Sequence, residues 1–462
     1  MNGSGILIMA AGKGTRMKSA YPKVLHNILD RPLIDYIVKN ALSCVDTPER
    51  VAVLVGFGGE LVEEHIKNNF PGVKILWQRE QKGTGHAVMT AQSWWRDFEN
   101  LIVLNGDLPL MRNISLSNFI AASKNYDCFI TSFITQNPKA YGRVIREGAG
   151  IRIVEFKDAS PEQKNINEVN AGCYAFKVAS LQNVLGGLSN RNSQEEYYLT
   201  DVLALMNAKK MTVNAFIMPE IEMQGVNNLH ELYEANNEMR MRIINKHLEN
   251  GVHIMDLSSV FIGADVEIGG DVAIMPNVHI WGNSKIGANS LIGTGSVLNN
   301  AIIGEHVNIV AYAIIENSEL KANSKAGPFV YIREGSCLNE NAFAGKFVEL
   351  KNSNIGQNSK VPHLSYMGDA ILGHDVNIGA GSITCNYDGS HKNKTVIGDN
   401  CFIGSDTMFV APVEVENNSA TAAGSVITKT IPENALGVAR SRQVNIAGWT
   451  KLKNAKTNNK GE

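Results

Sequence analysis

The stretch that decides the fold runs over residues 260–298 and reads VFIGADVEIGGDVAIMPNVHIWGNSKIGANSLIGTGSVL. Every sixth residue is valine or serine, namely Val260, Val266, Val272, Val278, Ser284, Ser290 and Ser296. Two residues after each stands an aliphatic side chain: Ile262, Ile268, Ile274, Ile280, Ile286, Ile292 and Leu298. Against the hydrophobic content of the chain, seven such matches arise by chance with a probability of roughly 0.3%.

A period of six residues is too short for a helix pair and too regular for an ordinary β-sandwich. It predicts a parallel β-helix in which each hexapeptide supplies one short strand and one turn. Each aliphatic residue points into the prism and stacks on its equivalent one coil away, while Asn and Gly suit the turns. The pattern returns at Ile397, Ile403, Phe409, Val415, Thr421 and Ile427. Residues 386–394 break the period, which predicts an inserted loop.

The chain before this solenoid alternates strand-like and helix-like segments. Buried strands are predicted at 5–9, 51–55, 100–104, 128–134, 171–176 and 212–218. Amphipathic stretches between several of them lie at 32–43, 60–69 and 85–95. This alternation is typical of a mostly parallel α/β sheet with helices on both faces.

Residues 228–250 follow helical spacing and predict one long helix between the two domains. Asn228 with Glu231 three residues later resembles a capping box, and Gly251 suits the C-terminal end. We therefore expect a domain at 1–227, a linker helix at 228–250 and a solenoid domain at 251–462.

Composition excludes several classes of function. The chain has 43 Lys and Arg against 45 Asp and Glu, a net charge of −2, which argues against a nucleic-acid binder. Six scattered cysteines without a Cys-x-x-Cys pair indicate reduced thiols, and no apolar run is long enough to span a membrane. We expect a soluble, cytoplasmic protein with a solvated basic tail carrying Lys451, Lys453, Lys456 and Lys460.

A glycine-rich loop follows the first predicted strand and reads Ala10-Ala11-Gly12-Lys13-Gly14-Thr15-Arg16-Met17. Such a loop lets backbone N–H groups approach phosphates, with Lys and Arg adding positive charge. The loop lacks the Walker spacing, and Met17 stands where a dinucleotide motif has its third glycine. Glycine spacing alone leaves a phosphate loop and a tight structural turn equally open.

Further motifs in fixed order carry a family resemblance. They are Pro22-Lys23-Val24-Leu25, Gln78, Gly83-Thr84-Gly85-His86-Ala87, Gly106-Asp107, Tyr141-Gly142-Arg143, Glu155, Asn170 and Val226-Asn227-Asn228. This set resembles the sugar-nucleotide pyrophosphorylases, and Gln78 with the 83–87 segment is similar to their uridyltransferase members. The resemblance implies a Rossmann-like nucleotidyltransferase domain in which a sugar 1-phosphate attacks UTP.

The same resemblance implies a role for each matched residue. Arg16 and Lys23 neutralise the phosphates, and Asp107 with Asn227 holds Mg²⁺ through oxygen ligands. Taken alone, Asp107 is an ordinary carboxylate at the end of a strand. The implied nucleotide and substrate contacts are Ala10, Ala11, Gly12, Gln78, Gly83, Thr84, Asn105 and Gly106. The implied sugar contacts are Gly142, Glu155, Asn170 and Asn227.

A second set of polar residues lies on the predicted β-helix. Because the interior is aliphatic, Arg333, Lys351, His363 and Tyr366 must face outward. An outward charged face is by itself only a solvated face. The set, however, resembles the hexapeptide-repeat acyltransferases, which form left-handed β-helices and use an outward histidine as general base between neighbouring subunits.

This second resemblance implies a direct acetyl transfer without an acyl-enzyme. His363 is the base, because an amine must lose a proton to attack a thioester productively. The implied sugar-phosphate ligands are Arg333, Lys351, Tyr366 and Asn377. The implied acetyl-coenzyme A contacts are Ala380, Asn386, Tyr387, Ser405, Ala423 and Arg440. A homotrimer is implied as well.

Together, the two halves resemble a family of bifunctional enzymes. Such enzymes acetylate glucosamine 1-phosphate and then join the product to UTP, giving UDP-N-acetylglucosamine for peptidoglycan and lipopolysaccharide. Two alternatives stay open, namely a one-reaction pyrophosphorylase with a structural solenoid, and a non-catalytic assembly subunit. The outward set at 333–386 disfavours the first, and intact Arg16, Lys23 and Asp107 disfavour the second.

Overall fold

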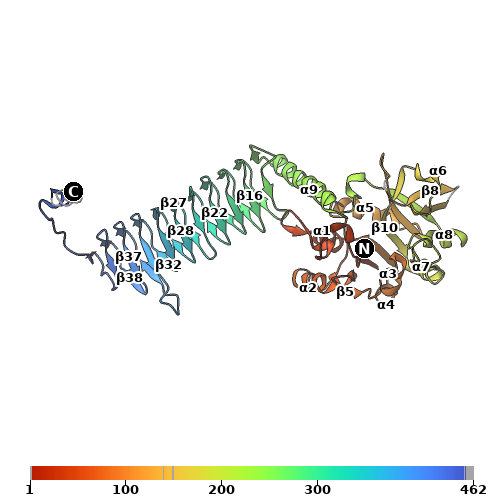
Figure 1. Cartoon of the computed structure of the whole chain (residues 1–462), viewed down its shortest axis with the longest axis horizontal. Coiled ribbons are helices and arrows are strands. Elements are labelled where there is room, and N and C mark those ends of the chain that lie inside the picture. Colours follow the sequence, from red (N-terminus) through yellow and green to blue (C-terminus); the bar gives the residue numbers. More distant parts are fainter. Residues whose placement is uncertain (1–2, 139, 148–149, 452, 454–462) are drawn as a thin grey trace, which may run out of the picture. The chain divides into compact units, whose positions relative to one another are not determined.

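The computed structural model describes residues 3–138, 140–147, 150–451 and 453. The chain forms two compact units, residues 1–242 and 243–462 (Figure 1). The division falls inside helix α9 (Leu229–Glu249), which coincides with the predicted long helix to within one residue at each end. Among the described residues, no helix combines the length and apolar character needed to cross a membrane.

The N-terminal unit is built on one sheet with the strand order β11-β7-β10-β6-β1-β4-β5. Its strands are β1 (Ser4–Ala10), β4 (Val51–Val55), β5 (Lys74–Trp77), β6 (Asn100–Asn105), β7 (Cys128–Ile134), β10 (Glu168–Lys177) and β11 (Val213–Ile217). Neighbours are parallel, except that β10 runs antiparallel to β6 and β7. The hairpin β8 (Arg143–Glu147) and β9 (Gly150–Val154) extends from β10, and neither strand was predicted.

Helices cover both faces of this sheet because successive strand residues point to opposite sides. On β1, Ile6 and Ile8 join one hydrophobic core and Leu7 joins the other. The first core is closed by α1 (Leu33–Leu42), α2 (Gly59–Asn69) and α5 (Asn113–Ser123). The second is closed by α3 (Thr84–Thr90), α4 (Gln92–Trp95), α7 (Val178–Leu185) and α8 (Asp201–Ala208). The stretch predicted as one helix at 85–95 is two helices, separated at Ala91.

The C-terminal unit is a parallel solenoid with three faces, drawn in Figure 1 as stacked arrows. Within the described residues, one sheet has eleven strands from β12 (His253–Ile254) to β41 (Leu436–Gly437). A second has ten, from β13 (Phe261–Ile262) to β40 (Val426–Ile427), and a third has nine, from β14 (Glu267–Ile268) to β38 (Val413–Val415). The parallel sheets and hexapeptide coils agree with the predicted left-handed β-helix.

The hexapeptide positions form the core of the solenoid as predicted. The paired aliphatic positions are buried in both repeat blocks, apart from Ile268. Ile268 lies on the first strand of its sheet, so it stacks on Ile286 from one side only. The break at 386–394 is a loop between β34 (Ile383–Cys385) and β35 (Thr395–Ile397).

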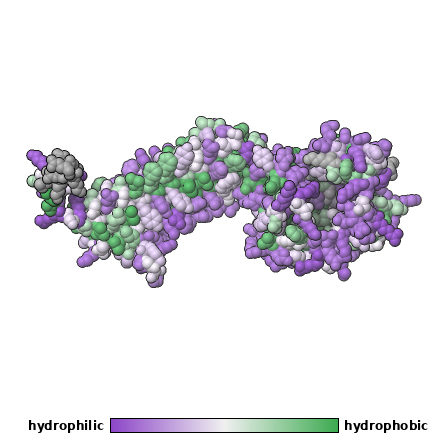
Figure 2. Space-filling model, in the orientation of Figure 1, coloured by the Kyte–Doolittle hydropathy of each residue, from purple (hydrophilic) through white to green (hydrophobic). Residues whose placement is uncertain are grey.

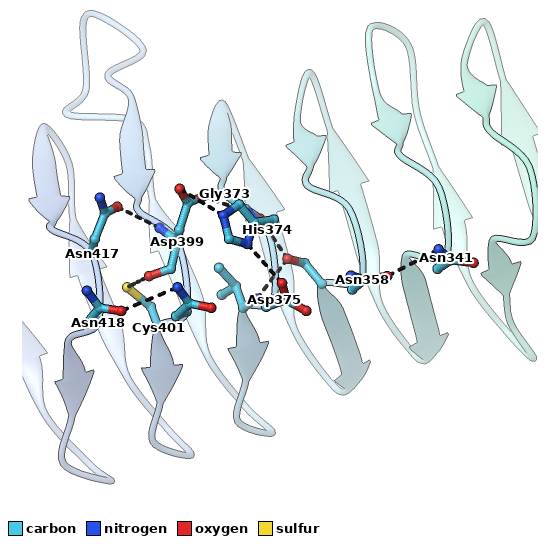
Figure 3. Close-up of polar contacts among 12 residues, drawn as sticks. Asn341, Asn358, Gly373, His374, Asp375, Asp399, Cys401, Asn417 and Asn418 are labelled. Carbon is cyan, nitrogen blue, oxygen red and sulfur yellow. Dashed lines mark hydrogen bonds and ion pairs between the residues drawn. The ribbon is translucent and has the colours of Figure 1, made fainter.

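Asparagines line one corner of the solenoid in the left-handed backbone conformation. Asn341 donates its side-chain amide to the Asn358 side-chain oxygen at 3.2 Å, one rung of a ladder drawn in Figure 3. At the coil that carries the inserted loop, Asp375 takes the asparagine position. There the His374 ring bridges two carboxylates, with Nδ1 2.9 Å from Asp375 Oδ2 and Nε2 3.2 Å from Asp399 Oδ2 (Figure 3).

Two candidate active sites

The first candidate site lies at the carboxyl ends of β1 and β6. Because these strands are parallel neighbours, the loop after Ala10 and the Gly106-Asp107 pair emerge at the same edge. Gly106 donates its backbone N–H to the Met9 carbonyl at 3.0 Å, which ties the two loops together. Sequence spacing alone does not predict that these two loops lie side by side, because almost a hundred residues separate them.

The Lys23 ammonium group is the centre of this site. Its Nζ donates to Asp107 Oδ2 at 2.5 Å and to Asn227 Oδ1 at 3.1 Å. Arg16 Nη2 donates to the same Asn227 oxygen at 2.9 Å. The two predicted phosphate ligands and the two predicted metal ligands therefore meet at one point.

That meeting point also bears on metal binding. One carboxylate oxygen and one amide oxygen converge on a single cationic group, and both are ligand types that Mg²⁺ accepts. Among the described residues, no group of three or more His, Cys, Asp or Glu side chains forms a metal cage. Two protein ligands suit a metal that also binds substrate phosphates.

A cleft of about 610 Å³ opens beside Lys23. Its lining includes predicted nucleotide and substrate contacts Ala10, Ala11, Gly12, Gln78, Gly83, Thr84 and Asn105. Gly106 is absent from the lining and acts through its bond to Met9. Glu196, which approaches from a distant loop, lines the cleft and was not predicted. Nothing in the local sequence around Glu196 distinguishes it.

Two glycines of the cleft, Gly12 and Gly83, differ in what the surrounding geometry requires. A Cβ at Gly12 would meet no atom within 4 Å, so this position borders open space where a phosphate can approach the backbone. Gly83 has φ +102°, and a Cβ there would lie 2.6 Å from the Tyr197 carbonyl oxygen. Gln78 is buried and donates to the Gly83 carbonyl at 3.2 Å. Its side chain also lies 3.0 Å from His86 Nδ1.

A second pocket of about 270 Å³ lies on the other side of Asp107. Arg16, Tyr141, Asn227 and Glu231 line it together with Asp107. Burial raises the pKa of the Tyr141 hydroxyl, helped by the Glu231 and Asp107 carboxylates. Asp107 borders both pockets, so a group bound in one can reach a group bound in the other.

The remaining predicted sugar contacts form a separate group. Asn170 donates its backbone N–H to the Gly142 carbonyl at 2.8 Å, and a Cβ on Gly142 would lie 3.4 Å from Glu155 Oε2. Burial raises the pKa of the Glu155 carboxyl, opposed by a hydrogen bond from Thr200. Gly142, Glu155 and Asn170 are gathered by the fold but line neither of the two pockets beside Asp107.

The second candidate site lies on one sheet of the solenoid. Strands β25 (Tyr331–Ile332) and β28 (Glu349–Lys351) are adjacent, which stacks Arg333 one coil below Lys351. Arg333 Nη1 donates to Glu349 Oε1 at 2.8 Å. The amine of Lys392 on the inserted loop lies close to the Lys351 amine, and this neighbouring cationic group lowers the pKa of Lys351. Three cationic side chains thus gather on an exposed face.

His363 ends strand β30 (Lys360–His363) on the neighbouring sheet, and its side chain is exposed. The Ser365 hydroxyl donates to the His363 carbonyl at 2.8 Å. Tyr366 begins β31 (Tyr366–Gly368), which continues the sheet of Arg333 and Lys351. Asn377 lies instead on β33 (Asn377–Ile378), beside Lys360 on the sheet of His363. The predicted sugar-phosphate ligands are therefore divided between two faces of one chain.

The predicted acetyl-coenzyme A contacts follow a regular column. Ala380, Ser405 and Ala423 each stand two residues after a stacked position of β33, β36 (Phe402–Ile403) or β39 (Ala420–Thr421). On the inserted loop, Asn386 donates its side-chain amide to Asp369 Oδ2 at 2.6 Å. Tyr387 is exposed and pairs with Lys392. Arg440 is exposed beyond the last strand.

Comparisons with known proteins match this division of the chain. A nucleotidyl transferase family model covers residues 6–241, and a bacterial transferase hexapeptide (six repeats) model covers 265–300 and 394–429. The chain is 44% identical to "Bifunctional protein GlmU" of Thermoanaerobacter pseudethanolicus over 97% of this chain and 98% of that protein. It is 43% identical to the protein of the same name from Caldanaerobacter subterraneus subsp. tengcongensis, over 96% of each. A solved structure of UDP-glucose pyrophosphorylase complexed with UDP-glucose is 20% identical, with TM-score 0.41, over 52% of this chain and all of that chain.

Proposed function

The chain belongs to the family of bifunctional GlmU proteins, and from this premise we propose that it carries out two reactions. Acetyl-coenzyme A acetylates glucosamine 1-phosphate, and the product then attacks UTP to give UDP-N-acetylglucosamine and pyrophosphate. We assign uridylyl transfer to residues 1–227 and acetyl transfer to 251–462, with 228–250 as the linker. The observation that carries the first activity is the meeting of Arg16, Lys23, Asp107 and Asn227.

In uridylyl transfer, the sugar phosphate oxygen attacks the α-phosphorus of UTP, and the bond to pyrophosphate breaks. Both reactants are anionic, so the protein must offset their repulsion and hold them in line. Lys23 and Arg16 supply positive charge at the boundary of the two pockets. The 610 Å³ cleft takes the nucleotide, and the 270 Å³ pocket lies where the attacking sugar phosphate enters.

Mg²⁺ is the cofactor that fits this site. Asp107 and Asn227 would hold it, because their oxygens already converge on a cationic group. When bound, the ion would offset negative charge on the phosphate oxygens. The Lys23 ammonium group donates to both of these oxygens, and it would turn toward a phosphate when they hold the ion.

In acetyl transfer, the amine nitrogen attacks the thioester carbonyl and loses its proton to His363. The carbon–sulfur bond then breaks and His363 returns the proton to the sulfur, so coenzyme A leaves as the thiol. An exposed imidazole is suited to accept that proton as a general base. Arg333, Lys351 and Lys392 form a cationic face for the sugar phosphate. The column Ala380, Ser405 and Ala423 offers small side chains along which coenzyme A can lie.

We propose that the active assembly is a homotrimer with the acetyl site at a subunit boundary. The division of Arg333 and Asn377 between two faces supports this, because one prism presents those faces in different directions. An apolar column supports it too: Tyr312, Phe329 and Phe347 stack at 5.3 Å spacing and are 49–59% exposed. Figure 2 shows hydrophobic colour gathered along the solenoid.

Substitution in the apolar column of Tyr312, Phe329 and Phe347 tests the proposed trimer. All three aromatic residues adopt the left-handed backbone conformation that other corners fill with asparagine. Burial against a neighbouring copy would offset that strain and cover the exposed rings. Phe347→Asp should lower the sedimentation mass from trimer to monomer, whereas Ile302→Asp, at an exposed strand position, should leave it unchanged. A trimeric Phe347→Asp protein would contradict this placement.

We place the protein in the cytoplasm as part of this proposal. UTP and acetyl-coenzyme A are metabolites of that compartment, and the six cysteines are all free thiols. UDP-N-acetylglucosamine made there supplies peptidoglycan and lipopolysaccharide synthesis.

The deciding experiment uses the full chain and two product assays. Coenzyme A release is measured with glucosamine 1-phosphate and acetyl-coenzyme A. Pyrophosphate release is measured with UTP, Mg²⁺ and N-acetylglucosamine 1-phosphate. Turnover in both assays is expected. Pyrophosphate release without coenzyme A release would reduce the protein to a one-reaction pyrophosphorylase with a structural solenoid, and turnover in neither would make it an assembly subunit.

A further inference from the structure

We propose that Glu231 is a positioning residue for uridylyl transfer, because it fixes Asn227 from the first turn of helix α9. The inference rests on the proposed uridylyl transfer and deepens it. Glu231 was predicted only as part of a helix capping box. Asn228 forms the predicted cap, but Glu231 does not complete the box. Its observed hydrogen-bond partner differs from the partner that a capping box predicts, and the proposed role rests on that observed partner.

Asn228 caps the helix as expected, since its side-chain oxygen accepts the backbone N–H groups of His230 at 3.0 Å and Glu231 at 2.9 Å. In a capping box the carboxylate bonds back to the N–H of the cap residue itself. Here the Glu231 Oε2 accepts the N–H of Asn227, one residue earlier, at 2.8 Å. The carboxylate therefore holds the metal-ligand candidate directly.

Both polar atoms of the Asn227 side chain are hydrogen-bonded as well. Its side-chain oxygen accepts from Arg16 and Lys23, and its Nδ2 donates to the Gly225 carbonyl at 3.2 Å. The N–H that Asn227 donates to Glu231 anchors the backbone of Asn227 to helix α9. Without that bond, the orientation of the Asn227 side-chain oxygen toward Arg16 would depend on the 225–227 loop keeping its position unaided.

A later turn of α9 anchors the Asp107 side of the same site. Arg242 Nη1 donates to the Leu110 carbonyl at 2.5 Å, three residues after Asp107, and its Nε donates to Glu238 at 2.8 Å. Asn236, between the two ends, accepts the backbone N–H of Leu29 at 2.8 Å. One helix thus holds both metal-ligand candidates, Asn227 through Glu231 and the Asp107 loop through Arg242.

Four variants of the full chain test the role of Glu231. Glu231→Ala removes the acceptor, Glu231→Asp keeps the charge but shortens the reach, and Glu231→Gln keeps an oxygen acceptor at full length. Glu234→Gln is the matched control, because Glu234 is exposed on the same helix and pairs with His230. Two quantities are measured: the Mg²⁺ dependence of pyrophosphate release, and the rise in thermal unfolding temperature caused by UTP with Mg²⁺.

Glu231→Ala and Glu231→Asp should each raise the Mg²⁺ concentration for half-maximal rate about tenfold or more, the loss expected for one charge-assisted hydrogen bond. They should also shrink the rise in unfolding temperature. Glu231→Gln should stay within about threefold of wild type, and Glu234→Gln should be unchanged. Coenzyme A release should stay at the wild-type rate in all four variants.

The opposite ranking overturns the inference. Glu231→Asp at the wild-type Mg²⁺ dependence, or Glu231→Gln as impaired as Glu231→Ala, would show that the bond to Asn227 has no positioning role. Should Glu231→Ala fail to fold, the Asp and Gln variants decide alone. Should the wild-type chain release no pyrophosphate, the proposed function fails, and the temperature rise with UTP and Mg²⁺ then decides the role of Glu231. No rise in wild type would overturn both.

Discussion

In the N-terminal unit, residues from three loops far apart in sequence meet on one ammonium group, whereas in the solenoid the site residues lie on two different sheets. Lys23, Asp107 and Asn227 are half-buried and hydrogen-bonded to one another. Arg333 and Asn377 belong to separate faces, and His363 is exposed. The first site gathers its residues within one chain, whereas we propose that a neighbouring subunit completes the second.

The difference follows from how each fold builds its interior. A layered sheet brings the ends of parallel strands to one edge, so loops from distant segments converge there. A solenoid places each residue beside its equivalent one coil away, so it makes columns and not pockets. A columnar surface becomes a pocket only against another surface, whether an inserted loop or a second copy. The following predictions test this contrast.

The largest effect is expected for Asp107→Ala. Loss of a carboxylate beside both pockets should lower pyrophosphate release by about a thousandfold or more, because several kcal/mol of phosphate-charge stabilisation depend on it. Coenzyme A release should be unchanged. The two product assays check this. Loss of both activities in a folded protein would show that the two sites are not independent.

His363→Ala should have the mirror-image effect. Removal of the general base should lower coenzyme A release by about 10²- to 10⁴-fold and spare pyrophosphate release. His306→Ala, at a left-handed corner of the same solenoid, is the matched control and should keep both activities. A His363→Ala protein with wild-type coenzyme A release would assign the proton transfer to another group.

Mixed assemblies test whether the acetyl site is shared between subunits. Arg333→Ala and Asn377→Ala should each lose acetyl transfer at least about tenfold. Co-expressed and purified as a mixture, they should recover about a quarter of wild-type coenzyme A release, since random assembly leaves that share of sites intact. Activity that stays at the level of the single variants would mean that both residues act within one chain.

His247 gives a smaller effect that is confined to stability. Burial lowers its pKa to about 4, and its Nδ1 has no hydrogen-bond partner. The unfolded chain, with an ordinary pKa near 6.5, binds the proton more tightly between these values, so stability is lost as the pH falls from 6.5 toward 4. The loss should amount to about 3 kcal/mol. Urea unfolding of the solenoid at pH 7 and pH 4.5 measures it, and His247→Leu should abolish most of the difference.

The smallest effect is expected for Cys385→Ala. This exposed thiol lies one coil from Gly368 on the sheet of Arg333 and Lys351, and it is the nearest candidate for an acyl-enzyme. Because the amine attacks acetyl-coenzyme A directly in the proposed reaction, coenzyme A release should stay within about twofold of wild type. An acetylated Cys385 formed at the rate of turnover would contradict direct attack.

Sequence predicted the solenoid better than any other part of the fold. The reason is that every hexapeptide lies in the same environment, so one pattern predicts that Ile262 and Ile403 are both buried. The rule does not predict the apolar column, because Tyr312 and Phe329 occupy corners where local preference favours asparagine. The residue type that suits such a corner depends on the surface that packs against the outside of the coil.

In the N-terminal unit, strand segments were predictable from apolar runs, and β4 and β7 match in both bounds. The hairpin of β8 and β9 was missed, because its residues alternate with charges and carry no buried run. The site itself came from family resemblance. No spacing rule places Asn227 beside Lys23, since that contact depends on how α9 is anchored.

Glu231 shows how a local pattern can hide a distant role. The sequence Asn228-x-x-Glu231 predicts a cap and gives a sufficient local reason for the glutamate. Its observed partner, the N–H of Asn227, and its place in the lining of the smaller pocket connect it to the site. Glu196 and Lys392 were missed for a related reason, because the loops that carry them have no period and no motif of their own.

The stacking of the coils has a consequence for how this solenoid can change in length. Each added coil lengthens a stack of parallel strands by one interstrand spacing of about 4.8 Å. The proposed acetyl site at β25 lies four rungs above β13 in its sheet. Insertions and deletions can therefore shift that site along the axis only in whole steps, each requiring a block of about three hexapeptides. The length of the solenoid therefore changes in whole coils. A smaller insertion is accommodated only as a loop, as at residues 386–394.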